Sequence, residues 1–269
     1  MSDWFVPLRA ASGPDGQPAD TADGQPVHTP VRLVVFPHAG GGPASLTTLA
    51  PLLPAGIEPW SVNLPGRQAR LAEDPRTDLD GLVDDLAAAL AASVPAPYAL
   101  FGYCSGALLA YLVCRRLGER GSSPQRLLVG SFAAPDVAPV PRRLHQLPSA
   151  LFWAQLVEAG GIPEELAGRT DLRPVLEPAL RADFAMLAGY RHSPGPPLDA
   201  PVTVLYGHHD RSVTRGGLLG WRRHSRHRPV LCGLDASHWL IEDAPAELAG
   251  AIAEQFPRPE VPACDSDTA

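Results

Sequence analysis

Lysine is missing from this sequence of 269 residues, so all 22 basic side chains are arginines. That absence excludes a pyridoxal-phosphate Schiff base, a lysine nucleophile and a phosphate loop of the G-x-x-x-x-G-K-S/T type. The four cysteines show no C-x-x-C spacing, and the first ten residues have no apolar export-signal core. We therefore expect reduced thiols and a cytoplasmic protein. The formal net charge of −7 argues against nucleic acid or an anionic membrane surface as a partner.

Proline, glycine and aspartate are frequent near the start of the chain, where apolar periodicity is almost absent. The stretch 10–29 predicts a linker, preceded by a short edge strand in WFVPL at 4–8. We interpret 1–29 as a flexible segment and 257–269 as a disordered tail. The single folded domain is expected over 30–256.

Buried strands and helices are expected to alternate through this domain. Short apolar runs bounded by turn residues occur at 31–36, 57–62, 97–101, 126–132, 201–206 and 228–232. Helical patterns follow at 44–53, 79–92, 105–118, 214–225 and 246–256. Apolar runs of this kind suit parallel strands covered on both faces, so we predict an α/β, doubly wound and mostly parallel sheet. The segment 140–195 breaks the alternation and predicts a helical lid over the carboxyl ends of the strands.

The most specific motif is GYCSGA at 102–107, between a predicted strand and a predicted helix. It matches the nucleophile elbow G-x-S-x-G with cysteine in place of serine. The tight turn requires small residues two positions before and after the nucleophile. Gly102 and Gly106 satisfy this for Cys104, whereas Ser105 would have Tyr103 and Ala107 there. Cys104 is therefore the candidate nucleophile; the alternative is a buried cysteine at a glycine-rich turn.

A second glycine-rich loop, FPHAGGG at 36–42, follows the first core strand. Backbone N–H groups in such a loop can stabilise an oxyanion together with the N–H that follows the nucleophile. The expected donors are Ala39 and Ser105. The alternative is a tight turn that needs glycine for its backbone conformation alone.

The elbow also needs a base and an orienting acid, in the chain order nucleophile, acid, histidine. Asp210 follows one predicted strand and His238 follows the last one. They are the candidate acid and base. Asp136, after an earlier strand, is a rival acid. His208, His209 and Asp210 could be taken as metal ligands, but adjacent histidines point apart on an extended chain, so no metal site is predicted.

Taken together, these motifs resemble the type II thioesterases, stand-alone α/β-hydrolases that accompany polyketide synthases and non-ribosomal peptide synthetases. The resemblance covers about 30–256. Its matching residues are FPHAGG (36–41), NLPGRQAR (63–70), GYCSGA (102–107), LRADFAMLAGYR (180–191), PLDAPVTVLYGHHD (197–210) and the His238 loop with its following helix.

The resemblance implies an enzyme that releases acyl groups from phosphopantetheine thioesters on acyl or peptidyl carrier proteins. It supports Asp210 over Asp136, and it implies no cofactor, because the substrate carries its own phosphopantetheine. The sequence departs from the family at the elbow, where members usually read G-H-S-M-G. Gly-Tyr-Cys is also similar to dienelactone hydrolases, which use cysteine on the same fold but have no comparable lid.

Two weaker features concern partners and substrate. The arginines between Asp210 and Asp235, with no acid among them, predict either a docking face for an acidic carrier protein or a solvated helix face. They are Arg211, Arg215, Arg222, Arg223, Arg226 and Arg228. In the lid, the expected acyl-chain contacts are Leu151, Phe152, Trp153 and Leu156, which alternatively pack the lid onto the body.

Two other functions remain open at this stage. One is an acyltransferase or cyclase that releases the acyl chain to an amine or hydroxyl. The other is a non-catalytic carrier-binding protein on a hydrolase fold.

Overall fold

The computed structural model describes residues 4–9 and 29–256. Within these ranges one seven-stranded sheet has the order β1-β3-β2-β4-β5-β6-β7. Its strands are β1 (Phe5–Pro7), β2 (Val31–Phe36), β3 (Ile57–Val62), β4 (Tyr98–Tyr103), β5 (Leu127–Gly130), β6 (Val202–Gly207) and β7 (Val230–Leu234). β1 is antiparallel to β3, and the other neighbouring pairs are parallel. The predicted α/β fold is confirmed, and the expected edge strand at 4–8 is β1.

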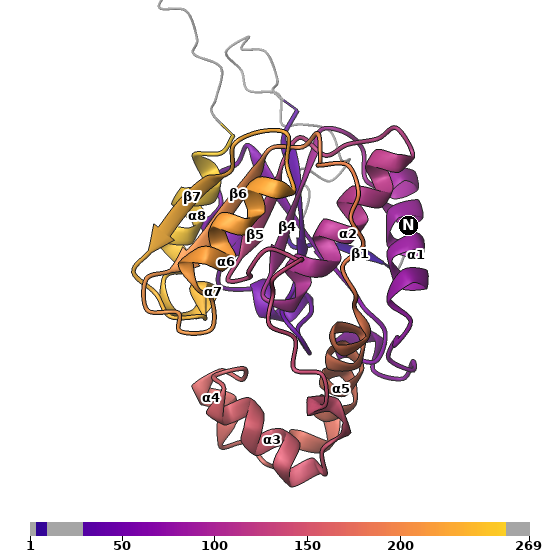
Figure 1. Ribbon diagram of the computed structural model, residues 1–269, viewed down its shortest axis with the longest axis vertical. Helices are drawn as coiled ribbons and strands as arrows, with labels where there is room; N and C mark the ends of the chain where they lie inside the picture. Colours follow the sequence, from indigo (N-terminus) through magenta and orange to yellow (C-terminus); the bar gives the residue numbers. More distant parts are fainter. Residues whose placement is uncertain (1–3, 10–28, 257–269) are drawn as a thin grey trace, which may run out of the picture.

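Helices cover both faces of the sheet (Figure 1). The α-helices are α1 (Leu79–Ser93), α2 (Ser105–Glu119), α3 (Ser149–Glu158), α4 (Glu164–Ala167), α5 (Arg173–Gly189), α6 (Arg215–Leu219), α7 (Leu240–Asp243) and α8 (Pro245–Ala253). Successive residues of a strand point to opposite faces. Leu100 of β4 therefore joins the apolar cluster under α1 and α2, while Phe101 joins the one under α7 and α8. All six residues of β4 are buried, so the strand that leads to the elbow is held on both sides.

Three predicted elements differ from the structure at proline or glycine. The helix expected at 44–53 is two 3-10 turns, Pro43–Leu46 and Ala50–Leu52, because Pro51 has no N–H to continue a helix. The helix expected at 214–225 ends as an α-helix at Leu219 and continues as a 3-10 turn, since its glycines disfavour helix. The last strand begins at Val230 rather than at 228, because Pro229 cannot donate to a strand ladder.

The segment predicted as a lid carries α3, α4 and α5, which lie together at one end of the molecule (Figure 1). Phe152, Trp153 and Leu156 of α3 form a small apolar cluster with Leu180 of α5. Ala39, from the glycine-rich loop after β2, belongs to the same cluster. The lid therefore packs directly on that loop.

The expected linker 10–29 and tail 257–269, with Cys264, lie almost wholly outside the described residues. Among the helices of the described ranges, none has the length and apolar character needed to cross a membrane.

Candidate active site

Cys104 lies in a strained turn between β4 and α2. Its backbone φ of 54° and ψ of −126° belong to a region that non-glycine residues rarely adopt. A Cβ at Gly106 would lie 2.2 Å from the Phe36 carbonyl oxygen, and one at Gly102 would lie 2.4 Å from the Ala107 Cα. Both positions therefore require glycine. This steric requirement places Cys104 at the apex of the turn, with Ser105 as the first residue of α2.

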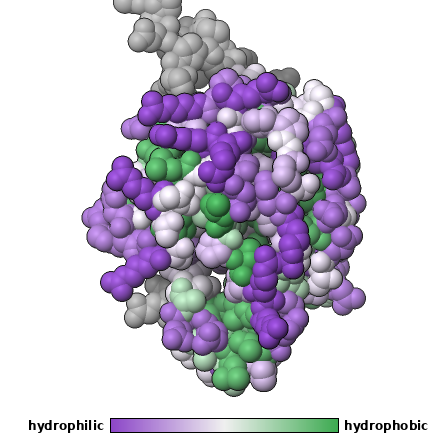
Figure 2. Space-filling model, in the orientation of Figure 1, coloured by the Kyte–Doolittle hydropathy of each residue, from purple (hydrophilic) through white to green (hydrophobic). Residues whose placement is uncertain are grey.

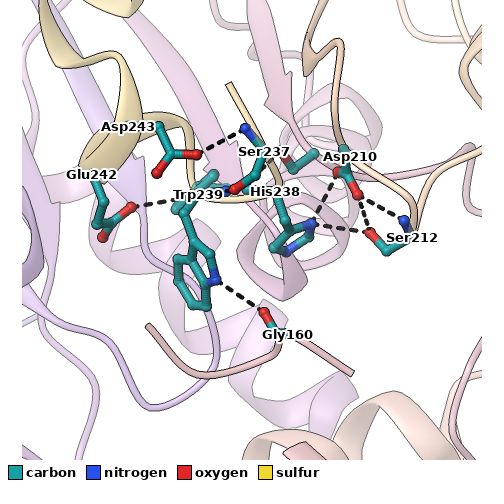
Figure 3. A network of polar contacts seen from close by, with 10 residues as sticks. Gly160, Asp210, Ser212, Ser237, His238, Trp239, Glu242 and Asp243 are labelled. Atoms are coloured by element: carbon teal, nitrogen blue, oxygen red, sulfur yellow. Dashed lines mark hydrogen bonds and ion pairs between the residues drawn. The ribbon is translucent and has the colours of Figure 1, made fainter. Parts of the chain in front are cut away.

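His238 and Asp210 meet at the carboxyl ends of β7 and β6 (Figure 3). The His238 Nδ1 lies 3.0 Å from Asp210 Oδ2, and the Asp210 side chain is only 2% exposed. The Cys104 side chain is within hydrogen-bond reach of the same imidazole. The structure thus brings together three residues that lie 106 and 28 positions apart along the chain.

Ser212 is a fourth member of this network, and sequence reasoning missed it. Its hydroxyl donates to Asp210 Oδ1 at 2.6 Å and lies 3.0 Å from His238 Nδ1 (Figure 3). Its backbone N–H also donates to Asp210 Oδ1, at 2.8 Å. A short polar residue two positions after an aspartate is the signal for such a turn. Both carboxylate oxygens of Asp210 are therefore held.

The charge state of His238 follows from these neighbours. Burial lowers its pKa, but the electrostatic interaction with Cys104 and the hydrogen bonds to Asp210 and Cys104 reverse the shift and raise the pKa of His238 to about 10. Burial likewise opposes ionisation of Asp210, yet the hydrogen bonds from His238 and Ser212 bring the pKa of that carboxyl below its ordinary value. At neutral pH the site therefore favours an imidazolium beside the Asp210 carboxylate.

The backbone of His238 is fixed by two further side chains that the sequence did not reveal. The hydroxyls of Tyr103 and Ser131 donate to the His238 carbonyl at 3.0 and 2.9 Å. Burial raises the pKa of Tyr103 well above its ordinary value, and the Glu242 carboxylate adds to that rise. The phenol therefore keeps its proton and remains a donor. Through Tyr103, the turn that carries Cys104 also positions the base.

The expected oxyanion donors lie in two different segments: Ala39 is in the loop after β2, and Ser105 is the first residue of α2. Ser105 opens α2, whose first N–H groups have no intrahelical acceptor. Within the described part of the chain, the backbone N–H groups of Ala39 and Ser105 have no hydrogen-bond acceptor. The next N–H in the loop, that of Gly40, donates instead to Asp183 Oδ2 of α5 at 2.8 Å. Two backbone donors thus remain available to a ligand.

A cavity of about 50 Å³ lies between the glycine-rich loop and the lid. His38, Ala39 and Gly40 line it from the loop, and Trp153, Ile162 and Leu180 are among its lid residues. Of the four lid residues expected to contact an acyl chain, only Trp153 lines this cavity. Phe152 and Leu156 are buried in the lid's own cluster.

Leu151 differs in position from the other three lid residues. Its side chain is 55% exposed, because it lies on the opposite face of α3 from the buried residues. Figure 2 shows apolar surface at the lid end of the molecule, and Leu151 is one of the exposed apolar side chains of the lid.

Asp136, the rival acid, belongs to a different cluster. Its carboxylate accepts hydrogen bonds from His224 Nε2 at 2.7 Å and from Arg223 at 2.6 Å. His209 lies 2.8 Å from Asp235, while its neighbour Asp210 faces His238. His209 and Asp210 therefore have separate partners, although they lie in a turn after β6 and not on an extended chain, with the Asp210 N–H donating to the Gly207 carbonyl at 3.2 Å.

The six arginines between Asp210 and Asp235 do not form one face beside the site. Arg211 adjoins Asp210, and Arg215 begins α6, so both lie near the carboxyl ends of the strands. Arg226 and Arg228 precede β7 and therefore lie at the amino end of that strand. At about 3.3 Å per strand residue, the length of β7 separates them from its carboxyl end by roughly 15 Å. Arg226 is moreover paired with Asp199 at 2.7 Å.

The parallel sheet, the strained turn after β4 and the His–Asp pair after β7 and β6 define an α/β-hydrolase. A model of the thioesterase domain matches residues 31–256. The chain therefore belongs to the thioesterase family.

Relatives in this family come from antibiotic and other peptide or polyketide pathways. The chain is 29% identical over 227 residues to the gramicidin S biosynthesis protein GrsT of Aneurinibacillus migulanus, covering 84% of this chain and 89% of GrsT. It is 32% identical over 231 residues to thioesterase PikA5 of Streptomyces venezuelae, covering 84% and 81%. A match of 34% identity to AmbE of Pseudomonas aeruginosa spans 11% of that much longer protein.

Solved structures of type II thioesterases superpose on the whole domain. BorB, from the borrelidin biosynthetic cluster, has a TM-score of 0.82 at 30% identity, covering 95% of this chain and 98% of BorB. YbtT, from the yersiniabactin pathway, has a TM-score of 0.79 at 28% identity, covering 94% and 98%. The chain is thus a hydrolase of the thioesterase type, with type II thioesterases of polyketide and non-ribosomal peptide pathways as its relatives.

Proposed function

We propose that this protein releases acyl groups from phosphopantetheine thioesters on acyl or peptidyl carrier proteins through an acyl–Cys104 intermediate. The observation that carries the proposal is the placement of Cys104 at the strained turn, within hydrogen-bond reach of an imidazole whose Nδ1 is held by Asp210. In this proposal Cys104 is the nucleophile, His238 the acid and base, and Asp210 the group that orients and stabilises the imidazolium.

Acylation begins when the Cys104 thiolate attacks the thioester carbonyl. The developing oxyanion accepts hydrogen bonds from the Ala39 and Ser105 N–H groups, and the dipole of α2 adds favourable potential. The bond between the carbonyl carbon and the pantetheine sulfur then breaks. The leaving thiolate takes the proton from His238 Nε2 and departs as a thiol.

Hydrolysis completes the cycle. His238, now neutral, removes a proton from a water molecule that attacks the acyl–Cys104 carbonyl. The second tetrahedral intermediate expels the Cys104 thiolate and leaves a free carboxylic acid. The imidazolium–thiolate pair is restored, and the substrate itself supplies the phosphopantetheine.

The carrier protein is the proposed macromolecular partner. Arg211 and Arg215 are exposed beside the site, and no ion pair involves either of them in the described ranges. Carrier proteins are typically acidic, so these two arginines supply charge of the complementary sign near the carboxyl ends of the strands, where the site lies. Arg226 and Arg228, at the amino end of β7, take no part in this proposed contact.

Cysteine at the turn favours one further reaction, acyl transfer or cyclisation. Transfer from pantetheine to Cys104 exchanges one thioester for another, so the acyl group stays activated toward an amine or hydroxyl. The lid contacts the loop that carries His238 directly, since Trp239 Nε1 donates to the Gly160 carbonyl at 2.9 Å (Figure 3). That contact would help to exclude water while a second nucleophile attacks.

Intact-mass analysis of the protein after incubation with acyl-carrier thioesters tests the proposal. The native chain should show an acyl adduct and release product, whereas Cys104→Ala should show no adduct and lose about 10³-fold or more in turnover. Cys232→Ala is the matched control, because Cys232 is a partly buried free thiol on β7 that has no part in the reaction. A folded Cys104→Ala variant that keeps half of the activity would refute the assignment of Cys104 and point to Ser105 or to a site without this triad. A native chain that neither forms an adduct nor releases product would instead leave a carrier-binding role.

A serine variant separates hydrolysis from transfer. If transfer is the role, Cys104→Ser should accumulate a stable acyl-enzyme or divert the product to free acid, since an oxoester reacts poorly with amines. If the native enzyme and Cys104→Ser release the same free acid and differ only in rate, the enzyme is a hydrolase.

A further inference from the structure

A buried ion pair joins the lid to the loop that follows β3. Arg67 Nη1 lies 2.6 Å from Asp183 Oδ2, and Arg67 Nη2 lies 2.8 Å from Asp183 Oδ1. The two side chains are only 5% and 8% exposed. A buried bidentate pair is costly to desolvate, and removing one partner alone strongly destabilises the fold because the other charge is left unpaired. Such a pair is therefore weak evidence for a stabilising role, and its contacts with the site have to be considered.

The pair contacts the glycine-rich loop at consecutive residues. Gly40 N–H donates to Asp183 Oδ2 at 2.8 Å, and Arg67 Nη1 donates to the Gly41 carbonyl at 3.4 Å. Gly40 has a φ of +72°, and a Cβ there would lie 2.8 Å from Leu180, one turn before Asp183 on α5. The helix and the ion pair together hold this part of the loop in one conformation.

We propose that Arg67 and Asp183 are positioning residues for the oxyanion hole. The inference rests on the proposed function, because it takes Ala39 N–H as an oxyanion donor. With the Gly40 N–H engaged by Asp183, the peptide plane that follows Ala39 is fixed, and the Ala39 N–H, which has no acceptor among the described residues, stays available to the substrate oxygen. Arg67 also neutralises the Asp183 carboxylate, which contacts Gly40, the residue that follows Ala39.

Charge balance makes this proposal specific. An unpaired Asp183 carboxylate would oppose the negative charge that develops on the substrate oxygen. At an effective dielectric of about 20, a unit charge about 7 Å from the oxyanion changes a rate on the order of 50-fold. An unpaired Arg67 has the opposite sign, and it would not oppose the oxyanion. The two single neutralisations should therefore have unequal effects.

Single-turnover acylation with an acyl N-acetylcysteamine thioester tests this inequality. Arg67→Met should slow acylation by about 50- to 100-fold with little change in KM. Asp183→Asn should cost less than about 10-fold, because the amide oxygen can still accept the Gly40 N–H. The double variant should recover much of the rate that Arg67→Met loses. Equal losses in both single variants, with a double variant no faster than Arg67→Met, would overturn the proposal.

The pH profile gives a readout that a structural role would not produce. In Arg67→Met the buried carboxylate loses its partner, and burial then favours its protonated form. The rate deficit of Arg67→Met should therefore shrink as the pH is lowered, while that of Asp183→Asn should not. A deficit in Arg67→Met that is constant with pH would contradict the charge argument.

Two further variants keep the test decisive. Arg181→Met removes a neighbouring ion pair of α5, with Glu177 at 2.6 Å, and it should stay within about threefold of the native rate because it does not touch the glycine-rich loop. If Arg67→Met fails to fold, Asp183→Asn is compared with Asp183→Leu, which lacks an acceptor for Gly40. The asparagine variant should be at least tenfold faster, and equal rates would refute the inference.

Intact mass of each reaction distinguishes the two levels of the argument. A native chain without a Cys104 adduct would overturn the proposed function and this inference with it. A native chain that forms the adduct, with Arg67→Met forming it at the same rate, would overturn the inference alone.

Discussion

Replacing Asp210 by asparagine is the most informative single change at the site. The substitution keeps the size of the side chain and removes its charge from a contact of 3.0 Å with His238 Nδ1. At an effective dielectric of about 20, two unit charges at that distance interact by about 5 kcal/mol. The imidazolium of the resting site, which supplies the proton for the leaving thiol, depends on this interaction, so acylation should slow by about 10³-fold or more.

Ser212 sets the limit of that loss. Its hydroxyl lies 3.0 Å from His238 Nδ1, so in Asp210→Asn it can accept the Nδ1–H and preserve the ring tautomer. A neutral hydrogen bond contributes about 1 kcal/mol. The double variant Asp210→Asn/Ser212→Ala should therefore be roughly fivefold slower than Asp210→Asn, whereas Ser212→Ala alone should remain within about tenfold of the native rate.

The assay is single-turnover acylation followed by intact mass, with circular dichroism to verify folding. Asp136→Asn is the matched control, because Asp136 pairs with His224 and Arg223 and not with His238. It should acylate at close to the native rate. If Asp136→Asn is slow and Asp210→Asn is fast, the acid follows β5 and the reasoning from the His238 contact is refuted.

Three further predictions follow from contacts described above. Tyr103→Phe removes one donor from the His238 carbonyl; kcat should fall about tenfold with KM little changed, and an unchanged kcat would contradict the positioning role. Gly106→Ala places a Cβ 2.2 Å from the Phe36 carbonyl oxygen, so urea unfolding should show a loss of about 3 kcal/mol or no folded protein, and a loss below about 1 kcal/mol would contradict the packing argument. Burial opposes ionisation of Asp136, but His224 and Arg223 bring its pKa below the ordinary value, so its contribution is present above about pH 4 and is lost as the pH falls further. The stability deficit of Asp136→Asn should therefore be about 1–2 kcal/mol at pH 7 and shrink as the pH falls below about 4.

The sequence was most informative where local sterics decide the structure. Two glycines around Cys104 predicted the turn and its register, because only one alignment leaves room at both positions. Apolar runs predicted the core strands for a similar reason, since a run that is apolar on both faces suits a covered sheet. Proline and glycine shifted the ends of several elements, as at Pro51 and Pro229.

Long-range polar contacts were not predictable in this way. Arg67 and Asp183 lie 116 positions apart, and each alone is an ordinary charged residue in a loop or a helix. Tyr103 precedes the nucleophile in the chain, and nothing in the sequence shows that its hydroxyl reaches a carbonyl 135 positions away. Periodicity also could not show that Arg226 and Arg228 lie at the amino ends of the strands and not beside the site, because that depends on strand direction and register.

The contact between Gly106 and the Phe36 carbonyl has a consequence for how such an enzyme can diversify. At Gly106 the turn that carries Cys104 approaches the backbone of Phe36 and Pro37 so closely that a Cβ would not fit. No side chain at this point of approach can be shortened or lengthened by substitution, so the spacing of the two oxyanion donors cannot be adjusted gradually there. The lid is different, because Trp153, Ile162 and Leu180 face the cavity with side chains of adjustable size. New substrate preferences can therefore arise by substitutions in 140–195 without altering the geometry around the reacting carbonyl.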